Sequence, residues 1–228
     1  MKIAVLNYSG NVGKTTIARD LLKPNLPDYE IVTIDTVNTD GKETMTLKGK
    51  DGKEIYFELL VRDNLILDIG SSNLEEYLKN TERHRALLKY IDKFIIPITP
   101  YVKQNKDSLK TVNDLIKFGV KPKKIYIIAN IVDRDEENIL NSEEFKILKE
   151  MKVNVCGRFI PKHEIYRVVG SVSAGATDNT DYITLLKEAK SKNDEKEIVR
   201  LANLHILQDI AIGINNIYLE IFDEIFKE

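Results

Sequence analysis

Residues 9–16 read SGNVGKTT and directly follow the apolar run 3–6. The segment therefore places a glycine-rich turn between a predicted buried strand and a predicted helix that begins near Lys14. In a phosphate-binding loop, small residues let consecutive backbone N–H groups converge on phosphate oxygens, a lysine reaches the outer phosphates, and a hydroxyl holds magnesium. The residues that fill these roles are Gly10, Gly13, Lys14 and Thr15.

The loop departs from the common pattern GxxxxGK[ST] at one position, because Tyr8 stands where the first glycine is expected. The apolar positions Ile17, Leu21 and Leu22 supply the helix that the pattern requires after the loop. The alternative is an ordinary strand-to-helix turn with a surface lysine. The predicted phosphate-binding set is Ser9, Gly10, Asn11, Val12, Gly13, Lys14, Thr15 and Thr16.

Composition is compatible with a globular nucleotide-binding protein. With 228 residues, 43% hydrophobic and 31% charged, residues 1–228 are expected to form a single domain with a substantial core. The formal charge of −2 is almost balanced, so contact with nucleic acid would need a local basic patch. The one cysteine, Cys156, excludes an internal disulfide, and the three histidines lack metal-ligand spacing.

No apolar stretch approaches the roughly 20 residues that a membrane-spanning helix needs. The sequence starts with a predicted strand rather than with a charged leader and an apolar core. We therefore expect a cytoplasmic protein with no membrane contact.

Short apolar runs alternate with helical or turn segments along the chain, a pattern typical of an α/β fold with a doubly wound, mostly parallel sheet. A hairpin turn at 50–53 is predicted to join strands at 45–47 and 55–57. Gly119 is predicted to end the helix 106–118. The apolar runs are 3–6, 31–34, 55–60, 65–67, 94–96, 125–128 and 153–155.

The C-terminal segment 195–226 carries apolar residues at steps of three and four, which predicts a long, or once-broken, amphipathic helix. Acidic residues dominate near its end, whereas membrane-surface helices favour Lys and Arg. We expect it to pack against the sheet or a second subunit.

Polar residues follow the predicted strands, and ligands of such sheets bind at the carboxyl ends of the strands. Asp68 ends one apolar run and is a candidate magnesium ligand opposite Thr15, as in a Walker B motif. Gly70 follows, where a backbone N–H could approach the γ-phosphate and a turn could respond to its loss. The alternative for Asp68 is a carboxylate that caps the next helix.

SGNVGKTT, Ile34-Asp35, Leu67-Asp68-Ile69-Gly70, the segment 96–100 and Ile128-Ala129-Asn130 together resemble the ParA/MinD family of dimerising ATPases, in the same order over most of the chain. The opening segment 1–22 is most similar to StbB-type plasmid stability proteins, a ParA-like branch. The resemblance implies bound ATP and Mg²⁺, a nucleotide-linked homodimer, a partner partition protein and contact with nonspecific DNA.

Two positions depart from this family pattern. Ser9 stands where the family has a signature lysine that reaches the partner's nucleotide. The family usually has two aspartates spaced one residue apart, of which the second orients the attacking water. Here the first is Asp35, and Val37 stands at the second position. Asn38 or Asp40 could take over that role. The candidate catalytic residues are Lys14, Asp35 and Asp68, and the alternative for Asp35 is an ordinary solvated carboxylate. We therefore predict slow hydrolysis without a partner.

The base-binding residues remain open between two purines. The resemblance assigns Asn130 to adenine, yet Asn130 and Asp133 also have the Asn-x-x-Asp spacing with which many GTPases bind guanine, so GTP is not excluded. Pro161 resembles the proline of the family's base-binding turn, although a proline also simply ends a strand.

The sequence favours a nucleotide-dependent switch, a Mg-ATPase for plasmid or DNA partitioning and stability. Alternatives are a small-molecule kinase or ligase of the dethiobiotin synthetase type and a nucleotide-binding scaffold with little hydrolysis. Basic residues in 42–53 and 187–200 are interleaved with acids, as on solvated faces. The candidate DNA contacts are Lys187, Lys190, Lys192, Lys196 and Arg200.

Overall fold

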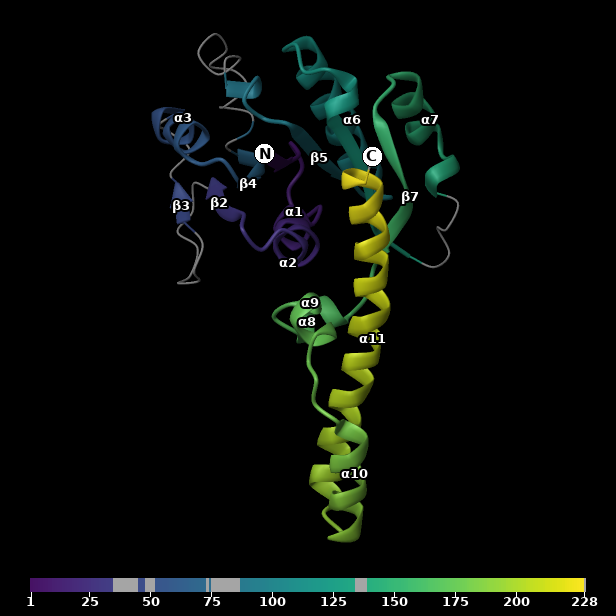
Figure 1. The fold of residues 1–228 in the computed structure, drawn as a ribbon. Helices are drawn as coiled ribbons and strands as arrows, with labels where there is room; N and C mark the ends of the chain where they lie inside the picture. Colours follow the sequence, from purple (N-terminus) through teal and green to yellow (C-terminus); the bar gives the residue numbers. More distant parts are fainter. Residues whose placement is uncertain (35–44, 48–51, 73, 75–86, 134–138, 228) are drawn as a thin grey trace.

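The computed structural model describes residues 1–34, 45–47, 52–72, 74, 87–133 and 139–227 (Figure 1). Its centre is a seven-stranded sheet with the order β3-β2-β4-β1-β5-β6-β7. Each pairing within the described sheet is parallel, which confirms the predicted doubly wound α/β fold. The strands are β1 (Lys2–Leu6), β2 (Glu30–Ile34), β3 (Met45–Leu47), β4 (Leu65–Ile69), β5 (Lys93–Ile98), β6 (Ile125–Val132) and β7 (Asn154–Pro161).

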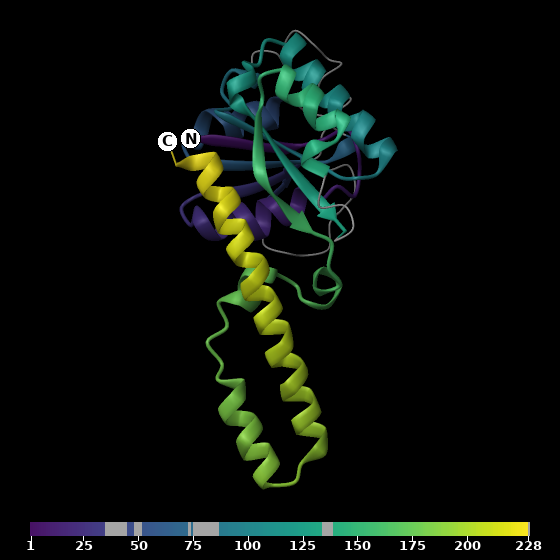
Figure 2. The same cartoon turned by 90° about the vertical axis from the view of Figure 1, so that its right-hand side faces the viewer.

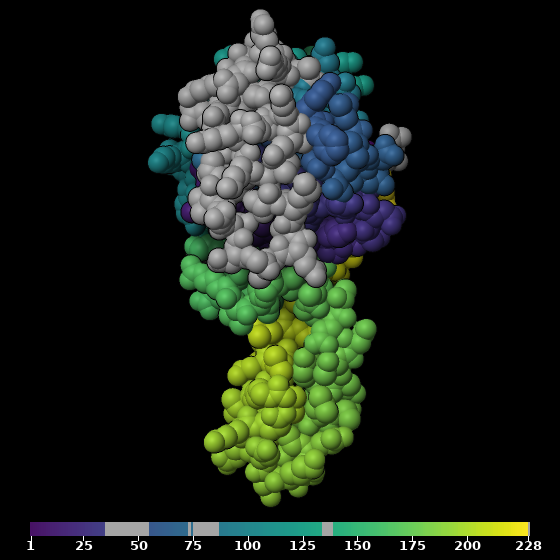
Figure 3. All heavy atoms as spheres, turned by 90° about the vertical axis from the view of Figure 1, so that its left-hand side faces the viewer, coloured from purple at the N-terminus to yellow at the C-terminus, as the bar shows by residue number. Residues whose placement is uncertain are grey.

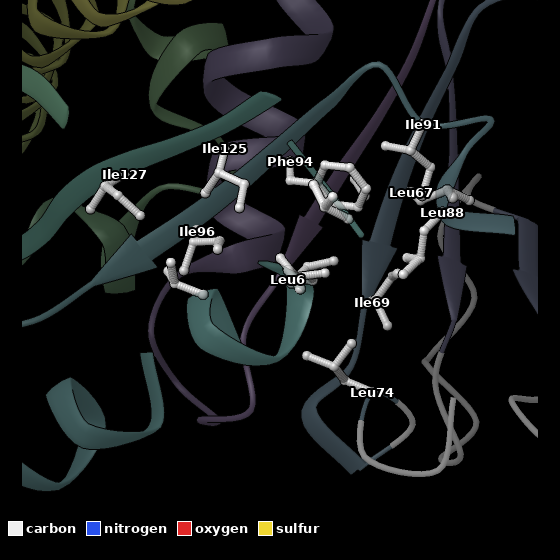
Figure 4. Packing of buried hydrophobic residues seen from close by; sticks show 14 of the residues in the cluster. Leu6, Leu67, Ile69, Leu74, Leu88, Ile91, Phe94, Ile96, Ile125 and Ile127 are labelled. Carbon is white, nitrogen blue, oxygen red and sulfur yellow. The ribbon is translucent and has the colours of Figure 1, made fainter. Parts of the chain in front are cut away.

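Helices cover both faces of this sheet because its central strands are apolar on both sides. In β1, Ala4 and Leu6 belong to a core cluster that includes residues of α3, α6 and α7, and Ile3 and Val5 belong to a cluster that includes residues of η1, α9 and α11. Figure 4 shows side chains of the first cluster. The helices are α1 (Lys14–Thr16), η1 (Ile17–Leu22), α2 (Lys23–Asn25), α3 (Gly52–Val61), α6 (Val102–Lys117), η2 (Pro122–Lys124), α7 (Glu143–Glu150), α8 (Ile165–Val168), α9 (Val172–Ala176), α10 (Tyr182–Ser191) and α11 (Glu195–Phe226).

The predicted hairpin around 50–53 is wrong. Residues 55–57 belong to helix α3, and β3 pairs in parallel with β2 instead of antiparallel with a following strand. Ile55 and Leu59 are buried one helical turn apart, whereas Phe57 is 60% exposed. The burial therefore follows a helical period of three to four residues, and exposed apolar side chains on the outer face hide this period in the sequence.

Helix α6 ends at the predicted glycine. Gly119 has a positive φ of 91°, its N–H donates to Ile116 O at 2.9 Å, and the N–H of Val120 donates to Leu115 O at 3.0 Å. This pair of bonds is the Schellman motif, in which a glycine adopts the left-handed conformation at low steric cost.

Helix α11 is a single unbroken helix, the first of the two forms that the sequence allowed, and its two halves have different surroundings. Its C-terminal half packs on η1 and β7, with Ala211, Tyr218 and Ile221 fully buried. Its N-terminal half pairs with α10 to form a helical hairpin, residues 182–210, which we call the arm (Figure 2). The arm projects away from the body of the molecule (Figure 3). None of the helices in the described parts of the chain is both long enough and apolar enough to cross a membrane.

Candidate functional site

The glycine-rich loop lies at the carboxyl end of β1, the strand between β4 and β5. Asn11 and Gly13 both have positive φ values, 56° and 87°. Asparagine adopts this conformation more readily than most residues, which explains how Asn11 replaces a glycine. Helix α1 starts at Lys14, immediately after Gly13. The free N–H groups of its first turn therefore point toward the loop, and the N-terminus of a helix favours anions.

Lys14 is buried and folds back on the loop. Its Nζ donates to Ser9 O at 2.7 Å and approaches Asn7 O at 3.4 Å. The ammonium therefore lies against the backbone of the turn that a phosphate group would enter. Phosphate oxygens are acceptors of the same kind as these carbonyl oxygens, and they add negative charge.

Thr15, in α1, contacts Asp68, in the strand β4 that pairs with β1. Thr15 Oγ1 donates to Asp68 Oδ2 at 2.6 Å, and Asp68 is 2% exposed. Asp68 is opposite Val5 in the parallel register, which brings the carboxylate beside the loop. A hydroxyl and a carboxylate are hard oxygen donors that suit Mg²⁺, which usually takes few protein ligands and completes its shell with phosphate oxygens and water. Among the described residues no three His, Cys, Asp or Glu side chains gather as a separate metal site.

Gly70 is held by the neighbouring strand. Its N–H donates to Ile34 O at 2.9 Å. An approach of this N–H to a γ-phosphate would therefore require the bond to β2 to break. Asp35, the next residue after Ile34, lies outside the described residues, as do Val37, Asn38 and Asp40.

Asn130 forms a hydrogen bond with the backbone of the glycine-rich loop. It lies in β6, is buried, and its Nδ2 donates to Val12 O at 2.7 Å. A Cβ atom at Gly13 would lie only 2.1 Å from Asn130 Nδ2. The amide assigned to the purine from the sequence thus contacts the loop backbone directly.

The other two candidate base-binding residues lie at the ends of β6 and β7. Asp133 accepts a hydrogen bond from Lys162 Nζ at 2.7 Å, and this contact raises the pKa of Lys162. Pro161 ends β7 opposite Val132, and the next N–H, that of Lys162, donates to Val132 O at 2.9 Å. The proline therefore occupies a strand end, next to the Asp133–Lys162 ion pair.

Sequence reasoning missed a set of polar residues that support the loop. Asn7 Nδ2 donates to Pro97 O and to Ser108 Oγ, both at 2.7 Å, while its Oδ1 accepts from the N–H of Ser9. The N–H of Tyr8 donates to Thr111 Oγ1 at 3.1 Å. A signal was present, because Asn105, Ser108 and Thr111 recur every three residues on the buried face of an otherwise amphipathic helix.

The helix that follows the loop is anchored by a buried charge. Asp20 is fully buried in η1, a π-helical segment continuous with α1 and α2, and forms a two-bond ion pair with Arg19. Ser171 Oγ donates to Asp20 at 2.6 Å and thereby ties the loop helix to the start of α9. These hydrogen bonds and the ion pair offset the free-energy cost of burying the Asp20 carboxylate.

The parallel sheet and the loop between β1 and α1 together define a P-loop nucleotide-binding protein. Residues 3–171 match the model of the CobQ/CobB/MinD/ParA nucleotide binding domain family. The match spans more than half of the chain and includes the loop, Asp68 and Asn130. The chain therefore belongs to this family of nucleotide-binding domains.

Several solved structures are similar in fold. The MinD cell division protein of Aquifex aeolicus is 14% identical over 73% of this chain and 84% of that chain, with a TM-score of 0.48. MinD from Pyrococcus horikoshii OT3, complexed with Mg-ADP, is 16% identical over 94% and 98%, with a TM-score of 0.46. A Cyanothece McdA–ATP complex is 16% identical over 93% and 96%, with a TM-score of 0.44. A comparison with curated protein sequences returned no match.

We predict that Asn130→Ala lowers the free energy of unfolding by about 1–3 kcal/mol, because the buried carbonyl of Val12 loses its donor. Urea denaturation would measure this loss. If Asn130 also binds the purine, the variant loses its preference between ATP and GTP in competition titrations. An unchanged stability together with a lost preference would mean that the amide serves the base alone.

Proposed function

We propose that the protein is a magnesium-dependent ATPase that works as a nucleotide-dependent switch. The observation that carries this proposal is the 2.6 Å hydrogen bond between Thr15 Oγ1 and Asp68 Oδ2, since Thr15 directly follows Lys14 in the chain. A hydroxyl, a carboxylate and a lysine at one loop are the groups that bind and neutralise the phosphates of a magnesium nucleotide in P-loop proteins.

Each residue has a definite task in this mechanism. The backbone N–H groups of the loop and the Lys14 ammonium bind phosphate oxygens, and Thr15 and Asp68 hold the magnesium ion. The magnesium nucleotide supplies a phosphoryl group whose charge is already partly neutralised. Asn130 keeps the loop in place through its hydrogen bond to Val12 O. Gly70 responds to the outer phosphate, because its N–H can leave Ile34 O and donate to that phosphate instead.

ATP is the proposed nucleotide, since the family resemblance assigns adenine to Asn130, and GTP is the alternative. In the structure Asp133 is paired with Lys162, so guanine recognition by this carboxylate would compete with an existing ion pair. A competition titration with both nucleotides separates the two.

We further propose that the switch acts in plasmid or DNA partitioning, with a nucleotide-linked homodimer and a partner partition protein. The arm supports a DNA contact, because it projects from the body and carries exposed lysines at its tip. Phosphate contacts require only convergent cations. Arg200 is already paired with Glu197, which leaves the lysines as the stronger candidates: Lys187, Lys190, Lys192 and Lys196.

The test is binding to nonspecific duplex DNA at two salt concentrations, without nucleotide, with ADP, and with ATP and magnesium. We expect ATP to change the DNA affinity of the wild-type protein but not of Lys14→Ala. Lys187→Glu/Lys190→Glu should weaken binding at least about tenfold and reduce the salt slope by about two. The matched control, Lys121→Glu/Lys123→Glu, changes two exposed lysines, one at the N-cap of η2 and one within it, and should bind as the wild type does. DNA binding that ignores nucleotide would contradict the switch.

A scaffold that binds ATP but scarcely hydrolyses it is the second candidate. Ser9 favours it, because this residue is 7% exposed and presents its carbonyl to Lys14, where the family has a lysine that reaches across a dimer. ATP that remains intact for hours after binding, with and without DNA, would establish the scaffold.

A further inference from the structure

A group of polar residues lies around Gly10, near the start of the glycine-rich loop. Gln104 Nε2 donates to Gly10 O at 3.3 Å, and Ser71 Oγ lies 3.6 Å from the position that a Cβ atom at Gly10 would occupy. Thr99 Oγ1 donates to Gln104 Oε1 at 2.5 Å. These residues come from segments that follow β1, β4 and β5, so they meet at the carboxyl edge of the sheet.

The outer phosphate would lie near the start of the loop, at Ser9 and Gly10. The lysine of a P-loop reaches the outer phosphates, and here the Lys14 ammonium rests on the carbonyl of Ser9, the residue before Gly10. Ser71 follows the magnesium-ligand candidate Asp68 by three residues. Gln104 is therefore next to the place where hydrolysis of a nucleoside triphosphate would occur.

The amide of Gln104 is fixed in one orientation and only partly used. Thr99 is fully buried at the end of β5 and holds the Oε1 atom, while Gln104 itself is half-buried in the first turn of α6. A glutamine offers two N–H groups and two carbonyl lone pairs. Among the described residues its side chain makes only the two contacts given above. One N–H and one carbonyl lone pair of the amide therefore remain available, and a water molecule can accept from the first and donate to the second.

We propose that Gln104, positioned by Thr99, orients the water that attacks the γ-phosphate; the assignment rests on the ATPase activity proposed above. The water oxygen forms a bond to the γ-phosphorus, and the bond from that phosphorus to the β–γ bridging oxygen breaks. Nucleoside diphosphate and inorganic phosphate leave, and the water proton passes to the phosphate. The amide aligns the water without accepting its proton, because an amide is not a base at neutral pH.

The sequence explains why such a residue is needed. Position 37 holds a valine, whose side chain forms no hydrogen bond with water, so another residue must orient the water. Asn38 and Asp40 are candidates from the sequence, and Gln104 is the candidate that the described residues place beside the loop. Gln104 lies in α6, which follows β5. In the sheet, β5 flanks β1 on one side and β4 flanks it on the other, so Gln104 and Asp68 come from opposite sides of β1.

A purely structural role for Gln104 makes a different prediction. If the residue only holds the Gly10 carbonyl, its loss shifts the loop and weakens binding of every nucleotide. If it orients water, its loss slows hydrolysis and weakens binding of a transition-state mimic, while ATP affinity stays the same.

The experiment compares Gln104→Ala with Gln208→Ala in the full chain. Gln208 is the other glutamine of the chain, and its Nε2 likewise donates to a backbone carbonyl, that of Asp178 at 2.6 Å, far from the loop on the arm. Three quantities are measured for each protein: the dissociation constant of a fluorescent ATP analogue, the affinity for ADP with magnesium and aluminium fluoride, and the single-turnover rate of ATP hydrolysis.

For Gln104→Ala we expect a rate at least tenfold lower, an equal loss of affinity for the aluminium fluoride complex, and an ATP dissociation constant within twofold of wild type. Gln208→Ala should match the wild type in all three. Thr99→Val, which keeps the side-chain shape but removes the hydroxyl, should slow hydrolysis by a smaller factor.

Two results would overturn the assignment alone: hydrolysis by Gln104→Ala at the wild-type rate, or a loss of ATP affinity as large as the loss of rate. If Asp40→Ala abolishes hydrolysis while Gln104→Ala does not, the orienting group lies after β2 instead. A wild-type protein that binds ATP and never hydrolyses it would overturn the ATPase activity together with the assignment.

Discussion

Gly13→Ala should abolish nucleotide binding and lower the free energy of unfolding by about 2–4 kcal/mol, the sum of left-handed backbone strain and a steric clash. The backbone at Gly13 has a φ of 87°, and an added Cβ would lie 2.1 Å from Asn130 Nδ2. Asn130 would have to move, and its hydrogen bond to Val12 O would then break. The loop would lose both its turn and its support.

Gly119→Ala is the matched control for this substitution. Gly119 has a similar φ of 91°, but nothing lies within 4 Å of a Cβ added there. We expect the strain alone, about 1–2 kcal/mol in urea denaturation, and unchanged affinity for a fluorescent ATP analogue. A Gly13→Ala protein that bound nucleotide as well as Gly119→Ala would show that the turn at Gly13 is not part of the site.

The order of elements could be predicted from the sequence wherever burial left a clear pattern. The runs at 65–67 and 94–96 lie within strands β4 and β5, and α11 begins and ends where the three- and four-residue steps do. The segment 55–60 could not be assigned correctly. Tyr56 and Phe57 are exposed on α3, so they add β-forming residues that carry no information about the core.

The loop residues could be predicted from their spacing, whereas the residues that support the loop could not. The strand, the glycines and Lys14 are consecutive, so local chemistry is enough to identify them. Asn7 contacts Ser108, and Gln104 contacts Gly10, across more than ninety residues of sequence. Such contacts depend on where α6 crosses the edge of the sheet, which only the packed structure defines.

The second large effect is expected for Asp68→Asn. Removing the carboxylate charge should abolish the magnesium-dependent gain in ATP affinity and lower the hydrolysis rate at least about 100-fold. The reason is that a metal ion bound to phosphoryl oxygens stabilises the charge of the transition state by several kcal/mol. The amide retains an oxygen that can accept the Thr15 hydroxyl, so the fold should survive. Binding is measured by titration with fluorescent ATP, with magnesium and with EDTA.

Asp92→Asn is the control, since Asp92 Oδ2 accepts the Lys2 N–H at the start of β1, at the opposite end of the strand from the loop. It should leave the magnesium dependence unchanged. Asp68 is almost completely buried, and its Oδ2 accepts the Thr15 hydroxyl, a bond that the amide oxygen of asparagine can also accept. Asp68→Asn should therefore unfold at about the same urea concentration as wild type, although its activity is lost. A variant that lost stability but kept its magnesium dependence would show instead that Asp68 only anchors the Thr15 hydroxyl.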